Sequence, residues 1–269
     1  MWRIVLLTLG LSFISASLLD EPRTFTFPIF GKEHERVTIV DSKLKDRVYY
    51  IVSGHGGPDP GATGTAGGRT VCEDEYAYDV ALRLAKRILA HDAMAYMITR
   101  DPDDGIRSEK YLDCDKDDYC WKDKKIPAGQ SARLQQRCDA VNTLYRKHLN
   151  TAIKSQILII LHIDSRSTKE RVDMFFYHDK KSKTGKAIAN QLRETIKVKY
   201  DRYQKNRGYE GKVSSRKLHV LNKSLPAAVY IELGNIRNMK DQKRFIVESN
   251  RQAVADWIAD GLIAYARED

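Results

Sequence analysis

The run of apolar residues ILIILHI, at positions 157 to 163, constrains the fold more than any other stretch of the chain. A strand that is buried on one side only alternates apolar and polar residues, whereas this run is apolar at successive positions. Such continuity is typical of a strand in the middle of a sheet whose two faces are both covered. We therefore expect a layered structure with this strand near its centre.

Other segments follow either a strand or a helix period. Strands are expected at 48–53, 94–99, 172–178 and 227–233, and helices at 74–90, 130–149, 185–200 and 240–266. Strands that alternate with helices predict an α/β fold, here a single layered domain with a mostly parallel or mixed central β-sheet flanked by helices. The chain has 269 residues, of which 42% are hydrophobic, enough for a substantial core.

The N-terminus resembles a secretory leader. Residues 1–17 combine a short basic start with an apolar stretch that ends in the small residues Ser15 and Ser17, so we expect a signal peptide cleaved after Ser17. Residues 18–47 would form an N-terminal extension, as an added β-hairpin or an edge strand, and residues 48–269 the main domain. The protein is then exported to a periplasmic or extracellular location.

The chain is basic, with a formal net charge of +10, so its natural partners are acidic. Nucleic acid, a polyanionic cell-wall polymer and an anionic membrane surface would all satisfy this charge. The basic residues are scattered and do not form an aromatic-interleaved stripe, which argues against nucleic acid. No segment after the leader is apolar enough to span a bilayer, so no stable membrane insertion is expected once the leader is removed.

The chain has four cysteines, Cys72, Cys114, Cys120 and Cys138. In an exported protein they can form disulfides. A short loop closed by Cys114 and Cys120, leaving Cys72 with Cys138, is one arrangement, but the sequence alone leaves the pairing open. Their spacing does not match that of a thiolate zinc site.

Polar residues stand where three expected strands end and where one helix begins. His55, His162 and Glu232 follow or end strands, and Glu73 precedes the first long helix. In layered α/β proteins the chemistry gathers at the carboxyl ends of the strands. Two imidazoles and one carboxylate would supply three ligands to a Zn²⁺ ion, and a second carboxylate would remain as a proton carrier.

One histidine lies in the glycine-rich turn SGHGGPDPG, residues 53 to 61. Glycines at 54, 56 and 57 allow a tight turn and close approach, so that His55 can point into a cleft. A phosphate-binding loop is the alternative for such a turn, but no GK[ST] sequence follows. The turn is therefore better suited to presenting the imidazole.

Six sequence blocks, in order from about residue 48 to the C-terminus, resemble the motifs of the zinc-dependent N-acetylmuramoyl-L-alanine amidases, the amidase 3 family of cell-wall hydrolases. The blocks are SGHGGPDPGATG, EDEYAYDVALRLAKRI, TRD, ARLQQRCDAVN, ILHIDS and AAVYIELGNIRN. The charged segment at 101–127 is longer than the link that the family has at this point.

The resemblance implies a role for each of the residues at the strand ends. His55 in the HGG block and His162 in the ILHIDS block would be zinc ligands, and Glu232 in the ELG block would be the catalytic glutamate. Relative to the family pattern, Leu161 stands before the second histidine, and Ile163 and Asp164 replace the usual Ala-Asn after it.

The acidic ligand of the family begins a pattern with hydrophobic residues three and five positions later. Glu73, followed by Tyr76 and Tyr78, meets this spacing, and Glu75 is the competing assignment.

By the same resemblance, the domain at 48–269 would be a zinc amidase catalytic domain. Its substrate would be peptidoglycan, and the bond cut would join N-acetylmuramic acid to the first L-alanine of the stem peptide. Two alternatives remain: a secreted, non-catalytic cell-wall binding protein of the same fold, and a zinc peptidase of different bond specificity.

Overall fold

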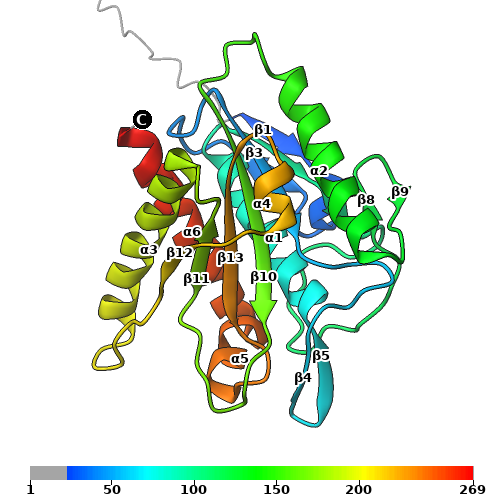
Figure 1. Ribbon diagram of the computed structural model, residues 1–269, viewed down its shortest axis with the longest axis vertical. Coiled ribbons are helices and arrows are strands. Elements are labelled where there is room, and N and C mark those ends of the chain that lie inside the picture. Colours follow the sequence, from blue (N-terminus) through cyan, green and yellow to red (C-terminus); the bar gives the residue numbers. More distant parts are fainter. Residues whose placement is uncertain (1–22, 269) are drawn as a thin grey trace, which may run out of the picture.

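The computed structural model describes residues 23–268, which form one α/β domain around a six-stranded sheet (Figure 1). In order across the sheet, the strands are β12 (Val213–Ser215), β11 (Phe175–His178), β13 (Ala227–Asn235), β10 (Ser155–Asp164), β3 (Arg47–Ser53) and β6 (Met94–Met97). Neighbouring strands are parallel except β11 and β13, which are antiparallel. The mixed α/β sheet predicted from the sequence is confirmed, and β10 lies inside it.

Helices cover both faces of this sheet (Figure 1). One face carries α1 (Glu73–Ala90), α3 (Lys183–Tyr203), α5 (Met239–Ile246) and α6 (Glu248–Glu268), and the other carries α2 (Gln130–Lys147) and α4 (His219–Lys223). Alternate residues of β10 divide between the two hydrophobic clusters. Ile157, Ile159 and Leu161 pack toward α1, α3 and α6, whereas Leu158 and Ile160 pack toward α2 and α4. Each of the five is at most 2% exposed, so the uninterrupted apolar run reflects burial on both faces.

The prediction of one continuous helix over 240–266 is wrong. The chain breaks at Val247, which has an extended backbone (φ −84°, ψ 120°) between α5 and α6. The fully buried guanidinium of Arg251 donates hydrogen bonds to the carbonyl oxygens of Phe245 (2.9 Å) and Ile246 (3.0 Å). Arg251 therefore satisfies the carbonyls of the last two residues of α5, and apolar periodicity alone could not reveal this cap.

Two predicted strands are shorter than expected. The strand expected over 172–178 begins only at Phe175, because Met174 has a left-handed backbone (φ 63°) that a strand cannot accommodate. The strand expected over 94–99 ends at Met97. The following residues, Thr99–Arg100, form β7 and pair with a different sheet.

Smaller sheets surround the core. They comprise β1 (Thr24–Thr26) with β2 (Arg36–Thr38), β4 (Thr63–Ala66) with β5 (Arg69–Cys72), and β7 with β8 (Tyr119–Cys120) and β9 (Lys124–Lys125). A 3-10 helix, η1 (Pro28–Phe30), lies between β1 and β2. The leader expected over 1–17 lies outside the described residues. Within residues 23–268, no helix combines the length and apolar character needed to cross a membrane.

The disulfide arrangement differs from the one considered above. Cys72, at the end of β5, is bonded to Cys114 in the charged segment, with a Cα–Cα distance of 5.8 Å. Cys120 and Cys138 are free and buried. Both pack in the hydrophobic cluster beneath α2, so Cys120 faces the core and Cys114 faces the start of α1. The segment at 101–127 is thus held against the N-terminus of α1.

Candidate metal and catalytic site

Three of the predicted residues converge at the carboxyl ends of adjacent parallel strands. His55 follows β3, while His162 and Glu232 are register partners on β10 and β13. The backbone N–H of Gly54 donates to the carbonyl of Leu161 (2.7 Å), which holds the end of β3 against β10. Because side chains two residues apart share a face of a strand, His162 and Glu232 both lie on the face covered by α2 and α4.

The turn after β3 has a backbone that favours glycine. His55 itself is left-handed (φ 65°), and Gly56 and Gly57 follow with φ values of 99° and 62°. The strain at His55 is offset by direct contacts: Arg137 donates to its carbonyl oxygen, and its Nδ1 lies 2.8 Å from Asp59 Oδ2. A carboxylate can only accept, so Nδ1 carries the proton and Nε2 remains free to act as a ligand.

Two glycines make room for the cluster. A Cβ at Gly54 would lie 2.2 Å from the ring of His162, and a Cβ at Gly61 would lie 2.7 Å from both Glu73 Oε2 and the His55 ring. No other residue type fits at these positions without displacing the site. The close approach inferred from the glycine-rich turn therefore has a specific geometric basis at Gly54 and Gly61.

Glu73 is the first residue of α1 and is delivered by the hairpin β4–β5, whose turn residues Gly67 and Gly68 both have positive φ. Its Oε2 accepts from the backbone N–H of Ala62 (2.8 Å). Its Oε1 accepts from the N–H of Ile163 (2.9 Å) and lies 2.7 Å from His162 Nδ1. Burial opposes ionisation, but the hydrogen bond with His162 and the nearby imidazoles hold the pKa of Glu73 below its ordinary value.

His55, Glu73 and His162 together form a compact donor set. Their ligand atoms all lie within 4.8 Å of one another, and the His55 Nε2 to Glu73 Oε2 distance is 3.3 Å. The two imidazole rings meet edge to face with centroids 4.9 Å apart. Two nitrogen donors and one carboxylate are the kind of three-residue set that holds a catalytic Zn²⁺. The donor set therefore fits the metal expected from the sequence.

Glu75 faces the other way, into the charged segment. Its Oε2 accepts from Arg107 (2.9 Å) and its Oε1 from the backbone N–H of Asp115 (3.2 Å). The structure thus brings Glu73 to the histidines and keeps Glu75 away from them. A helical step of two residues rotates a side chain by about 200°, which explains why only one of the two can face the site.

Glu232 is buried, 6% exposed, and its Oε2 has no hydrogen-bond partner among the described residues. Burial, with added repulsion from Glu73 and Asp164, holds the pKa of Glu232 well above its ordinary value. Tyr230 lies two residues before Glu232, on the same face of β13, and its ring stacks on that of His162 with centroids 4.4 Å apart. An unpaired carboxyl oxygen in a buried site destabilises the fold, and a chemical role for Glu232 would explain why it is retained.

Sequence reasoning missed the residues that support this cluster. Arg133 and Arg137 lie on the same face of α2, and Arg133 donates to Asp59 Oδ2 (2.6 Å). Both arginines, with His55 and His162, line a small cavity of about 40 Å³. The four-residue spacing of the arginines in ARLQQRC indicates a shared helix face, but not which loop this face would meet.

The family model described as N-acetylmuramoyl-L-alanine amidase (Amidase_3) matches residues 50–264. The chain belongs to this family. A comparison with curated protein sequences returns no match.

Solved structures of amidases share the fold. The N-acetylmuramoyl-L-alanine amidase of Clostridium difficile 630 is 19% identical with a TM-score of 0.58, over 83% of this chain and 97% of that one. The CwlV catalytic domain of Bacillus (Paenibacillus) polymyxa var. colistinus is 21% identical with a TM-score of 0.56, over 81% and 97%. Ami1 of Mycobacterium smegmatis is 17% identical with a TM-score of 0.57, over 84% and 99%. These likenesses support the α/β architecture described above.

Proposed function

We propose that the protein is a zinc-dependent hydrolase of peptidoglycan that cleaves the amide bond between N-acetylmuramic acid and L-alanine. Family membership supports amide hydrolysis in the cell wall. The observation that carries the finer proposal is the pairing of a compact His55, Glu73 and His162 donor set with the unpartnered Oε2 of Glu232 on the next strand.

In this proposal His55, Glu73 and His162 hold the metal. Zinc at such a site supplies a Lewis acid for the scissile carbonyl and lowers the pKa of water. Asp59 fixes the tautomer of His55 by accepting a hydrogen bond from its Nδ1. The backbone N–H groups of Ala62 and Ile163 donate hydrogen bonds that fix the carboxylate of Glu73. His55 and Glu73 are therefore oriented before any ligand arrives.

Glu232 carries the proton. Its Oε2 accepts a proton from the attacking water as the new C–O bond forms at the lactyl carbonyl. When the C–N bond breaks, the same oxygen delivers that proton to the departing nitrogen of L-alanine. The products are a free lactyl carboxylate on the glycan and a free amine on the peptide.

We also propose that the protein works outside the cytoplasm, in contact with the cell wall. The leader-like residues 1–17 and the Cys72–Cys114 disulfide both suit an oxidising compartment. The disulfide lies next to Glu73, so it restrains the segment that presents a proposed ligand.

The test is mass spectrometry of the products released from purified sacculi, with and without a chelator. The proposal expects free peptides that begin with L-alanine, glycan strands that have lost them, and no release after chelation. Release of shorter peptides cut within the stem would point to a zinc peptidase. Wall binding without any release would point to a non-catalytic binder.

A further inference from the structure

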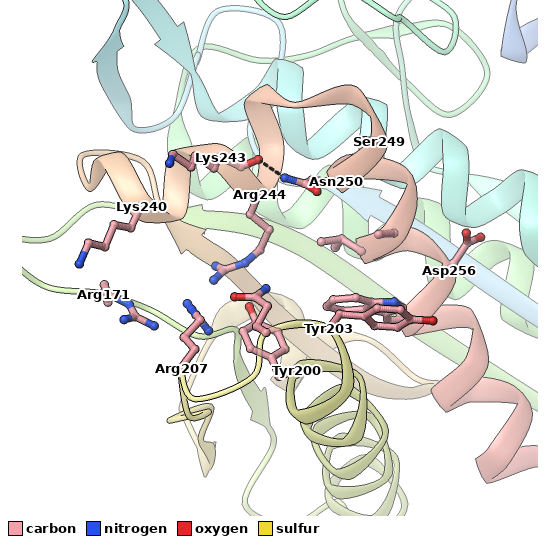
Figure 2. Close-up of a pocket in the computed structure, with 14 residues that line it drawn as sticks. Arg171, Tyr200, Tyr203, Arg207, Lys240, Lys243, Arg244, Ser249, Asn250 and Asp256 are labelled. Carbon is pink, nitrogen blue, oxygen red and sulfur yellow. Dashed lines mark hydrogen bonds between the residues drawn. The ribbon is translucent and has the colours of Figure 1, made fainter.

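A second, larger cavity lies on the opposite face of the sheet from His55 and His162. It has a volume of about 880 Å³ and lies among α3, α5, α6 and the segments at 165–174 and 204–212 (Figure 2). The segment 165–174 leaves β10, which carries His162, and α5 follows β13, which carries Glu232. The segments that follow β10 and β13 therefore both contribute to the wall of this cavity.

One end of the cavity is strongly cationic. Figure 2 shows Arg171, Arg207 and Arg244 directed toward one another. All three approach a single carboxylate, Asp173, at 3.4, 2.5 and 3.5 Å respectively. Arg244 is also held by backbone carbonyls and pairs with Asp241 at 3.5 Å, so its role is partly structural. Two carboxylates cannot saturate three guanidinium groups, each of which has five N–H donors.

Two of these arginines are accessible from the cavity, because the side chains of Arg171 and Arg207 are 31% and 20% exposed. Lys240 and Lys243, both on α5, add two ammonium groups at the wall, and neither forms an ion pair with another described residue. An arginine fork favours a planar anion such as a carboxylate, and the lysines add charge with less directional demand.

The other end of the cavity is aromatic. The rings of Tyr203 and Trp257 stack with an interplanar angle of 9° and centroids 6.1 Å apart. Tyr203 is 60% exposed, so this pair presents a flat apolar surface to solvent. Between this pair and the cations, the ring of Tyr200 is buried (1% exposed), and the guanidinium of Arg207 lies 4.7 Å from its centroid. A flat aromatic face beside anion-binding groups suits a sugar ring that carries an acidic substituent.

We propose that this cavity binds a glycan strand that bears free carboxylates. The inference rests on the proposed function, because amide hydrolysis at the lactyl group would leave such a carboxylate on every muramic acid that loses its peptide. The arginines and lysines bind the carboxylate, and the Tyr203–Trp257 surface packs against the sugar ring. The cavity would thus retain the product strand and hold the enzyme on glycan that it has already cleared of peptide.

The test measures binding of peptide-free glycan strands to the full chain by isothermal titration calorimetry. The Glu232→Gln variant is used as the background, so that hydrolysis of any residual peptide is slowed during the measurement. The double change Lys240→Ala with Lys243→Ala should raise the Kd roughly tenfold, as expected for the loss of two exposed charge contacts. Tyr203→Ala should raise the Kd several-fold, whereas Tyr203→Phe, which retains the ring, should leave it unchanged.

Lys186→Ala with Lys197→Ala is the matched control, because both lysines are exposed on α3 and lie outside the cavity. This pair should not change the Kd. Equal binding of a neutral N-acetylglucosamine oligomer, or tighter binding of inorganic polyphosphate, would overturn the carboxylate assignment. If the parent hydrolyses sacculi but does not bind peptide-free glycan, this inference fails and the proposed function stands. If it binds the glycan but does not hydrolyse sacculi, the proposed function fails.

Discussion

The two sides of the candidate site hold buried glutamates in opposite states. At the start of α1, Glu73 accepts two backbone hydrogen bonds and lies beside two imidazoles, and its pKa is lowered. At the end of β13, Glu232 has an oxygen without a partner in the described part of the chain, and its pKa is raised. Both side chains are almost fully buried, so burial alone does not separate them.

The difference lies in the neighbouring groups. A carboxylate that is fixed and kept ionised is suited to hold a cation, whereas one that favours a proton is suited to proton transfer. Carboxylates whose surroundings push their pKa values apart are a recurring sign of divided roles. The contrast therefore supports Glu73 as the ligand and Glu232 as the proton carrier, and each assignment can be tested separately.

The largest expected effect follows from removing the ligand. Glu73→Gln should lose most bound zinc and all measurable release of peptides from sacculi, because the amide carries no charge for the metal. Glu75→Gln, two residues along the same helix, is the matched control and should keep its metal. Atomic absorption of the purified variants measures the metal content. The reverse pattern would move the ligand to Glu75.

The next largest effect concerns the proton carrier. Glu232→Gln should retain about as much zinc as the parent and lose ~10²- to 10⁴-fold in hydrolysis rate, the usual contribution of positioned proton transfer. Steady-state assays on soluble muramoyl-peptides, with metal content measured on the same samples, separate binding from catalysis. Loss of zinc in this variant would make Glu232 a ligand and remove the contrast with Glu73.

Much of the fold followed from periodicity, because the core strands and helices bury continuous or amphipathic apolar sets. The run at 157–163 marks the sheet interior for this reason. The break at Val247 and the Cys72–Cys114 pairing did not follow, since both depend on contacts between segments far apart in the sequence. The hairpin β4–β5 carried a signal in its Gly-Gly turn, which matches a two-residue hairpin connection.

The candidate site was predictable to the extent that its residues lie at strand ends. His55, His162 and Glu232 follow from the meeting of parallel strands at one edge. Asp59, Arg133 and the contact of Gly54 with His162 depend on how α2 and the glycine-rich turn pack on the sheet. The glycines of the turn indicate a close approach, but no pattern within a single segment shows that Arg133 meets Asp59 or that Gly54 meets His162.

A third effect, smaller than the first two, tests the support of the ligand side. Asp59→Asn weakens the hydrogen bond from His55 Nδ1 and should lower zinc affinity roughly 10- to 100-fold, as for other outer-shell partners of metal-bound histidines. Competition with a fluorescent zinc chelator measures the affinity. Asp41→Asn is a matched control, because Asp41 makes a similar contact with His91 (2.7 Å) away from the site. Equal effects of the two changes would show a general loss of stability.

The disulfide beside Glu73 should contribute to stability more than to chemistry. Its partners are 42 residues apart, for which the chain-entropy model gives about 3–4 kcal/mol. Replacing both Cys72 and Cys114 with Ser should lower the Tm by roughly 5–15 °C in a chain of this size. Reductant should lower the Tm of the parent and leave that of the double variant unchanged. A reductant effect of equal size in both would assign the stabilisation elsewhere.

The smallest effect concerns how the free energy of unfolding depends on pH, measured after a chelator has removed any bound metal. The two glutamates should contribute to this dependence with opposite signs. The folded chain holds the pKa of Glu232 above its ordinary value of 4.5, so the folded state retains a proton that the unfolded state loses. Stability therefore falls as pH rises from about 4.5 toward the folded pKa, and Glu232→Gln should gain stability relative to the parent over this range.

Glu73 has the opposite sign. Its folded pKa lies below 4.5, so its contribution is present above that pH and is lost as pH falls through the folded pKa. Glu73→Gln should therefore lose stability relative to the parent as pH rises from 3 to about 5. Urea unfolding at several pH values gives both curves. Parallel curves for the two variants would show that the glutamates share one environment, and the division of roles would have to be abandoned.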